Sequence, residues 1–115
     1  MEKDQKIDVY LVCNAKYHDT NFARLELLKL LGENEDIHTR VADSFSDVAA
    51  ISSSTLLITY TCDLRPTPEE QEGLAKFIGN GGRWFALHAT SALLDFADDG
   101  RVDTPDVAPK FMEVL

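Results

Sequence analysis

Residues 81–91 read Gly-Gly-Arg-Trp-Phe-Ala-Leu-His-Ala-Thr-Ser, and this stretch decides the fold. Its two glycines end a predicted helix, and the apolar run after them predicts a buried strand from Arg83 to Leu87. His88 stands where that strand stops, and small residues lead from it into a predicted helix over 89–96. Ligands of open α/β sheets bind where strands end and helices begin. His88 therefore occupies the position of a catalytic or binding residue.

Three further strands are predicted on the amino-terminal side of this stretch. Residues 7–13 and 55–60 are apolar and rich in β-formers, as central strands of a parallel sheet are. Residues 37–42 alternate between apolar and polar side chains, which favours an edge strand. The spacing of apolar residues over 43–53 indicates a short helix or a structured loop between two of these strands.

Two helices carry clear signals between the strands. The first has an apolar stripe at helical spacing that is expected to be buried, made of Phe22, Leu25, Leu28 and Leu31, and widened by Leu27 and Leu30. The second begins with a capping box, in which Thr67 caps the helix, Pro68 takes the first helical position and Glu70 closes the box. Gly32 and the sequence Asn80-Gly81-Gly82 end the two helices.

Alternating strands and helices predict a parallel sheet with right-handed crossovers. The order 2-1-3-4 places the two most apolar strands in the middle, so we expect a flavodoxin-like α/β three-layer sandwich with helices on both faces. A single domain is expected over residues 1–115, with an irregular polar tail over 98–115. The tail closes on the apolar residues 111–115. They indicate either that the chain is the amino-terminal part of a longer domain, or that a short helix packs at this end.

Composition excludes several classes of partner. The chain has 20 acidic and 11 basic residues and a formal net charge of −9, so no basic stripe can neutralise a nucleic acid or an anionic membrane. No apolar run reaches the roughly 18 residues of a membrane-spanning helix, and the charged start does not read as a secretory signal. Cys13 and Cys62 lack CxxC spacing. These features predict a cytoplasmic protein with two free thiols, and a disulfide only if the two strands are neighbours.

The sequence resembles the ThuA-like (trehalose-utilisation-like) family of the class I glutamine amidotransferase-like superfamily. The residues that carry the resemblance are Thr67-Pro68-Glu69-Glu70-Gln71-Glu72, Phe77-Ile78-Gly79-Asn80-Gly81-Gly82, Phe85-Ala86-Leu87-His88-Ala89 and, in the first loop, Tyr17-His18-Asp19. The resemblance implies a flavodoxin-like fold and a link to sugar metabolism. It also implies that His88 takes the position of the nucleophilic cysteine of true glutamine amidotransferases. The chain is shorter than the usual family member.

His88 is the predicted catalytic residue. A strand-to-helix elbow exposes its central residue beside backbone N–H groups, which suits an anion or an oxyanion. Imidazole at this point can bind a metal, donate to a sugar hydroxyl or carry a proton. The alternative is a histidine that only satisfies buried backbone groups at the end of a strand.

The loops after the first and third strands supply the predicted substrate-binding residues. His18 and Asp19 follow the first strand, and with His88 they predict either a site for a divalent metal such as zinc or a set of hydrogen bonds to a polyol. The alternative for Asp19 is that it, or Thr20, caps the next helix. Asp63 and Arg65 follow the third strand.

Arg65 can clamp an anionic substrate, and Cys62 beside it is a candidate reactive thiol. The alternative is an ordinary surface loop. His38, on the expected edge strand, is assigned no function.

Two functions are therefore expected as alternatives. The first is a ThuA-like protein that binds or acts on a carbohydrate-derived small molecule, with His88 and His18 in its site. The second is a non-catalytic α/β module, or a partial domain that self-associates into a homodimer or higher oligomer, because an unpaired sheet edge invites association.

Overall fold

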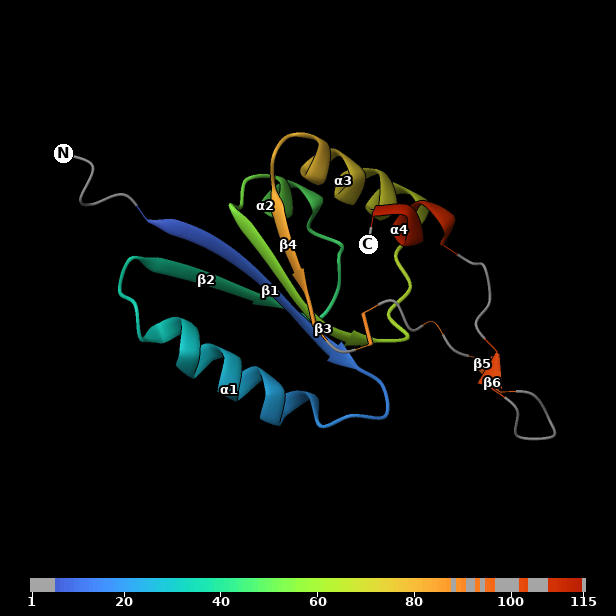
Figure 1. Ribbon diagram of the computed structural model, residues 1–115, viewed down its shortest axis with the longest axis horizontal. Helices are drawn as coiled ribbons and strands as arrows, with labels where there is room; N and C mark the ends of the chain where they lie inside the picture. Colours follow the sequence, from blue (N-terminus) through green and yellow to red (C-terminus); the bar gives the residue numbers. More distant parts are fainter. Residues whose placement is uncertain are drawn as a thin grey trace.

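A four-stranded parallel sheet forms the centre of the molecule, with the strand order β2-β1-β3-β4 (Figure 1). The computed structural model describes residues 6–87, 89–90, 93, 95–96, 102–103 and 108–114. The strands of the sheet are β1 (Ile7–Ala15), β2 (Ile37–Ala42), β3 (Leu56–Cys62) and β4 (Arg83–Ala86). The predicted order and the position of residues 37–42 at an edge of the sheet are confirmed. The first strand continues two residues further than expected, to Ala15.

Helices cover both faces of this sheet, as the flavodoxin-like prediction requires (Figure 1). The helices are α1 (Thr20–Gly32), α2 (Val48–Ser52), α3 (Pro68–Gly79) and α4 (Pro109–Val114). Helix α1 lies on one face, and α2, α3 and α4 lie on the other. In the part of the chain that the structure describes, no helix is long and apolar enough to cross a membrane.

Side chains along β1 alternate between the two faces and build two separate cores. Val9, Leu11 and Cys13 pack with Leu31 of α1 and Ile58 of β3. The larger core lies on the other face, and its buried members are Tyr10, Val12, Phe45, Ala50, Ile51, Leu57, Leu74, Phe77, Leu93, Ala108 and Phe111. Because β1 is buried on both faces, it reads as a nearly continuous apolar run, which is the pattern of a central parallel strand.

The predicted buried stripe of α1 is partly wrong. Phe22 and Leu25 are 64% and 54% exposed, and the side chains that face the sheet are Leu27, Leu28 and Leu31. The helix is therefore rotated relative to the expectation. It carries so many leucines that the spacing alone does not identify the buried face.

Helix α3 agrees with its sequence signals. The Thr67 side chain accepts the N–H of Glu70, and the Glu70 carboxylate accepts the N–H of Thr67, which completes the capping box with Pro68 in the first turn. Gly81 adopts a φ of 93°, a left-handed conformation that glycine reaches without steric cost. The chain can therefore turn at once from α3 into β4.

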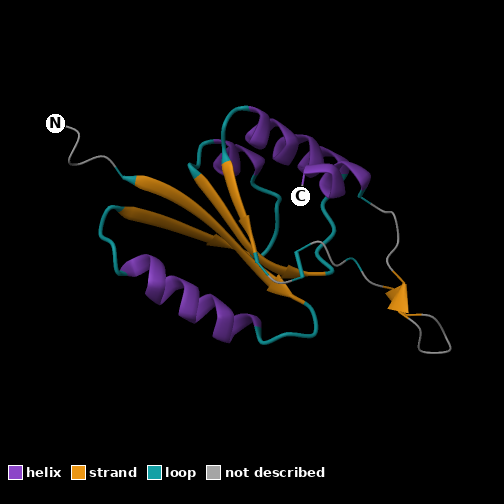
Figure 2. Ribbon diagram, viewed as in Figure 1, coloured by secondary structure: helices purple, strands orange, loops and turns teal. Residues whose placement is uncertain are grey.

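The carboxyl-terminal part differs from the expectation in two respects. The predicted helix over 89–96 is wrong where the structure describes it. Residues 89 and 90 form a turn, and β5 (Asp95–Phe96) pairs antiparallel with β6 (Val102–Asp103) apart from the main sheet (Figure 2). The tail over 98–115 is also not irregular throughout, since it contains β6 and α4. Residues 111–114 belong to the short helix α4, which packs against α3, as the second alternative for this end of the chain expected; Leu115 lies outside the described residues.

Gln71 of α3 holds α4 in place. Its side-chain amide donates to the Pro66 carbonyl oxygen at 3.2 Å, and its carbonyl oxygen accepts the backbone N–H groups of Lys110 and Phe111 at 3.1 and 3.2 Å. Lys110 also pairs with Glu72 at the surface, which lowers the pKa of that carboxyl. These hydrogen bonds satisfy the buried Gln71 side chain and fix the first turn of α4. The Phe111 side chain is therefore held in the core, where it is fully buried.

Substitution by alanine is expected to have opposite effects on stability at two glycines of α3, Gly73 and Gly79. A Cβ at Gly73 would overlap the Val48 side chain of α2, whereas a Cβ at Gly79 meets nothing within 4 Å. We expect Gly73→Ala to lower the free energy of unfolding by about 1–3 kcal/mol, because it overpacks the α2–α3 contact. We expect Gly79→Ala to raise it by up to about 1 kcal/mol, because alanine suits a helix better. Urea denaturation of both variants checks the pair, and equal effects would contradict it.

Candidate functional site

The loops after β1 and β3 lie side by side at the carboxyl edge of the sheet. Strand β1 pairs with β2 on one side and with β3 on the other, so the chain changes direction across the sheet between β1 and β3. The backbone N–H of Lys16 donates to the Cys62 carbonyl oxygen at 3.2 Å and continues the pairing past the end of β1. The prediction that loops 14–20 and 61–66 face each other is thus confirmed. Such a switch point is where open α/β sheets bind ligands.

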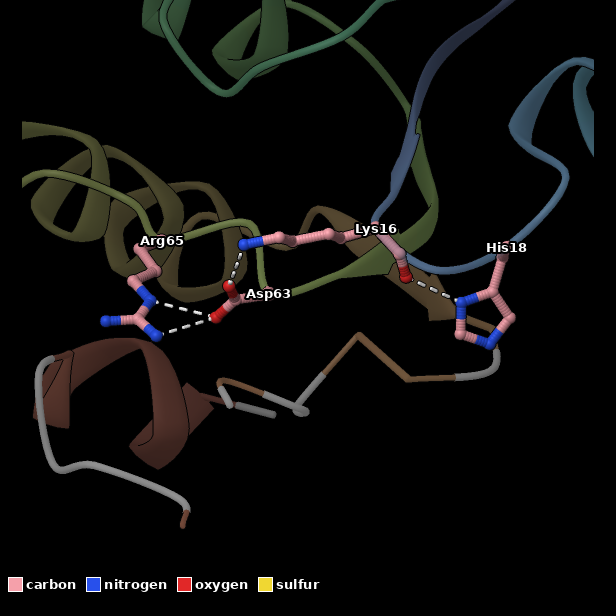
Figure 3. Close-up of polar contacts among 4 residues, drawn as sticks. All are labelled: Lys16, His18, Asp63 and Arg65. Carbon is pink, nitrogen blue, oxygen red and sulfur yellow. Dashed lines mark hydrogen bonds and ion pairs between the residues drawn. The ribbon is translucent and has the colours of Figure 1, made fainter. Parts of the chain in front are cut away.

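A carboxylate that is only 8% exposed joins the two loops (Figure 3). Asp63 accepts hydrogen bonds from Arg65 Nε and Nη2 at 2.9 and 2.8 Å, both through Oδ1. Its Oδ2 lies 3.5 Å from Lys16 Nζ in the facing loop. The predicted residues Asp63 and Arg65 therefore do come together, but Asp63 acts on the two cations rather than presenting its carboxylate to solvent.

His18 lies on the opposite side of Lys16 from Asp63 (Figure 3). Its Nδ1 is 2.8 Å from the Lys16 carbonyl oxygen, so Nδ1 carries the proton and donates to that oxygen. In the neutral ring, Nε2 is then the nitrogen with a lone pair, which is the form that accepts a proton or binds a metal. The edge of the ring also meets Tyr60 of β3, with ring centroids 6.2 Å apart. These contacts orient the imidazole.

Backbone strain gathers at the same edge of the sheet. The non-glycine residues with left-handed φ angles, in the part of the chain that is described, are Tyr17 (70°), Asp63 (54°) and Ala89 (65°). Each of them follows the end of a different strand, β1, β3 or β4. Left-handed residues other than glycine carry a steric penalty of about 1–2 kcal/mol, and they cluster at functional sites.

A buried hydroxyl network ties the turn after β4 to β3. The indole N–H of Trp84 donates to Thr59 Oγ1 at 3.0 Å, and Thr59 Oγ1 lies 2.9 Å from Thr90 Oγ1. Thr90 Oγ1 in turn lies 2.9 Å from the Leu87 carbonyl oxygen. His88, the predicted catalytic residue, lies outside the described residues. Leu87, the residue before it, continues the pairing with β3 past the end of β4, because its N–H donates to the Thr59 carbonyl oxygen at 2.8 Å.

Asp19 caps the amino-terminal end of α1, which is the alternative to a substrate-binding role. Its carboxylate accepts the backbone N–H of Phe22 at 3.0 Å, which satisfies a free donor of the first turn of α1. If Asp19 binds a substrate as predicted, the oxygen that accepts the Phe22 N–H has to be shared with that substrate, or the substrate has to bind the other oxygen. His38 lies on edge strand β2 with a side chain that is 76% exposed, and its Nδ1 is 3.8 Å from Asp8 Oδ1.

Both cysteines are buried and free. Burial is the main reason that the pKa of the Cys62 thiol is raised, and the neighbouring Asp63 raises it further. A buried neutral thiol is a poor nucleophile, so the interpretation of Cys62 as a reactive thiol is not supported. Cys13 and Cys62 are on neighbouring strands but out of register, because Cys13 pairs with Tyr60 and Cys62 pairs with Ala15.

No group of three His, Cys, Asp or Glu side chains that could hold a metal ion occurs among the described residues. His18 alone has a feature of a metal ligand there, a ring nitrogen fixed by a carbonyl oxygen. The predicted partner His88 lies outside that part of the chain, so a zinc site at His18 and His88 stays a prediction.

Sequence reasoning missed Lys16 and Thr59, and it gave no role to Tyr17 and Tyr60, the two tyrosines that border the site. Lys16 is the first residue after β1, and its charge in the loop that follows the predicted strand was an available signal. Tyr17 is 59% exposed, and Lys16 Nζ lies 5.4 Å from the centre of its ring. Thr59 gave no signal, because a threonine within an apolar strand is ordinary.

Comparisons with protein-family models, with curated proteins and with solved structures found no match to this chain.

Proposed function

We propose that this protein binds, or acts on, a carbohydrate-derived small molecule at the switch point between β1 and β3, as the resemblance to ThuA-like proteins implies. One observation carries the proposal: Asp63 holds Lys16 and Arg65 together across the two loops. Cationic N–H donors fixed in this way suit the oxygen atoms of a polyol or its acidic derivatives.

The surroundings of this ion cluster support a sugar rather than a flat aromatic ligand. His18 supplies an oriented imidazole, and the exposed ring of Tyr17 supplies an apolar surface with a hydroxyl at its end. A sugar has both an apolar face of C–H groups and a rim of hydroxyl groups, so these side chains complement it. In this proposal His88 keeps the catalytic role in the segment after β4, and a divalent metal held with His18 is part of the same hypothesis.

Binding measurements with trehalose, glucose and gluconate test the proposal. We expect at least one of them to shift the amide resonances of residues 16–18 and 61–65 in NMR spectra. His18→Ala and Asp63→Asn are expected to weaken that binding by about 10- to 100-fold, since each removes a hydrogen bond to or beside a charged group. The matched control is His38→Ala, which changes an exposed histidine on the edge strand and is expected to bind like the wild type.

Unchanged affinity in both site variants, or no shift with any of the three sugars, would overturn the proposal. Metal analysis of protein purified without added metal, repeated for His18→Ala and His88→Ala, tests the metal. Loss of a bound divalent ion in both variants is the expected result for a shared site.

Self-association is the second candidate, and one observation favours it. In the described part of the chain β4 pairs only with β3, and its Phe85 side chain is 57% exposed. A second copy could pair with this edge and cover Phe85. Sedimentation velocity on the same samples distinguishes the candidates, because a monomer at micromolar concentration that binds sugar supports the first alone.

A further inference from the structure

One face of the sheet is covered by a single helix in the described part of the chain. Helix α1 packs mainly on β1 and β2, whereas β4 forms the edge of the sheet farther from this helix (Figure 1). Phe85 of β4 pairs with Ile58 of β3, so its side chain lies on the α1 face, where it is 57% exposed. Leu56 and Leu87 on the same face are only partly buried. The β3–β4 surface, made of Leu56, Phe85 and Leu87, is therefore apolar and lacks a covering helix among the described elements.

Helix α1 has the converse feature, an apolar side without a sheet. Its outward side carries Phe22, Leu25 and Leu30, and each of them is more than half exposed. Leu28 and Leu31 on its inward side pack against β1 and β3. A helix that is apolar all round is typical of a helix buried on more than one side. The composition of α1 therefore suits a helix that packs between two layers.

The apolar side of α1 and the β3–β4 surface lie on the same face of the molecule. Apart from Tyr17 and Met112, the large apolar side chains that are exposed in the described residues all lie on this face. Their exposed parts amount to roughly 600 Å² per copy, and a stable interface buries about 800 Å² per partner, part of it in a polar rim. Apolar patches of this size commonly mark interaction sites.

The charges of this region do not oppose the association of two copies. Helix α1 carries Arg24, Glu26 and Lys29, β4 adds Arg83, and β3 has no charged side chain. The acidic excess of a chain with net charge −9 therefore lies outside these three elements. Arg83 is exposed beside the β3–β4 surface, and Glu26 is exposed on α1, so the two can form an ion pair between copies.

We propose that a second copy of this chain covers the β3–β4 surface with its α1, in a two-fold symmetric dimer. Each copy then supplies one helix side and one sheet surface, which is the self-complementary arrangement that an isologous interface requires. The two α1 helices lie side by side between the two sheets, so that each is covered on both sides. This goes beyond the pairing of β4 edges considered above, because edge pairing uses main-chain groups and leaves α1 outside the contact.

Sedimentation velocity of the full chain, from micromolar to millimolar concentration, tests the proposal. We expect a monomer–dimer equilibrium. Leu25→Lys and Phe85→Glu are each expected to weaken the dimer about 10- to 100-fold, because each places a charge in the apolar contact. Met112→Lys is the matched control, since it changes an exposed apolar side chain of α4 on the other face and is expected to dimerise like the wild type. All three side chains are exposed, so urea denaturation should show folded variants.

A mixture of the Leu25→Lys and Phe85→Glu variants gives the sharpest test. In a mixed dimer one of the two equivalent contacts is wild type, and the other brings the new lysine to the new glutamate. We expect the mixture to associate more tightly than either variant alone.

Four results would overturn the proposal. They are a wild-type chain that stays monomeric at millimolar concentration, a Leu25→Lys variant that dimerises like the wild type, an equal loss of dimer in Met112→Lys, and a mixture that associates no better than its components. The second of these results is the one that edge pairing predicts. Because neither Leu25 nor Phe85 belongs to the proposed sugar site, sugar binding and this dimer can fail independently.

Discussion

Replacement of Phe111 by alanine is expected to lower the free energy of unfolding by about 3–5 kcal/mol, which is the usual cost of removing a fully buried phenylalanine. The Phe111 side chain is 0% exposed, and its ring centroid lies 5.8 Å from those of both Phe45 and Trp84. The loss therefore opens a cavity among three aromatic rings and also removes ring–ring contacts. Urea denaturation followed by Trp84 fluorescence measures the effect.

The neighbouring residue provides the control for this prediction. Met112 is 37% exposed, so Met112→Ala is expected to change stability by less than about 1 kcal/mol. If the two variants were equally stable, α4 would not pack on the core as described. Gln71 extends the test, because it holds the first turn of α4. Gln71→Met and Phe111→Ala act on the same contact, so their combined effect should be smaller than the sum.

Thr59→Val is expected to cost about 2–4 kcal/mol although it barely changes the volume of the side chain, because it leaves one buried donor unsatisfied and removes a second hydrogen bond. The Trp84 indole N–H loses its acceptor, and Thr90 loses its hydroxyl partner. Since Thr90 belongs to the turn after β4, the substitution should also loosen that turn.

Two measurements check this prediction. Urea denaturation gives the stability change, and the NMR resonance of the Trp84 indole N–H should move toward its position in an unfolded chain. Thr55→Val is the matched control, because Thr55 precedes the same strand and its side chain is exposed. A Thr59→Val variant as stable as Thr55→Val would show that the hydroxyl network contributes little.

Local signals predicted the fold well because the apolar strands and the capped helix leave few alternatives. Residues 9–13 of the first apolar run are buried, as their composition requires, and the box of Thr67 and Glu70 marks the start of a helix to the residue. The rotation of α1 was not predictable in this way. Leucines surround that helix, so its buried face depends on where the sheet lies, which is tertiary information.

Long-range contacts explain the errors near the end of the chain. Small residues after His88 favour a helix locally, but Thr90 bonds instead to Thr59, 31 residues earlier. Residues 109–114 form a helix because Gln71, about 40 residues away, satisfies its first N–H groups. The site was predicted in part. The predicted strand order was enough to place Asp63 and Arg65 at the carboxyl edge of the sheet. The ion pair of Lys16 with Asp63 depends in addition on the register of β1 against β3, which the sequence does not reveal.

The left-handed residues after β1, β3 and β4 lower the stability of the protein, and two of them supply side chains of the proposed site. Glycine would adopt each of these backbone conformations without steric penalty, and this gain would exceed the added conformational freedom of the unfolded chain only where the strain is large. At Tyr17 and Asp63 such relief would delete an aromatic ring or the carboxylate that joins two loops. Ala89 carries neither, and it is therefore the position at which heat resistance can be gained while every polar group of the proposed site is kept.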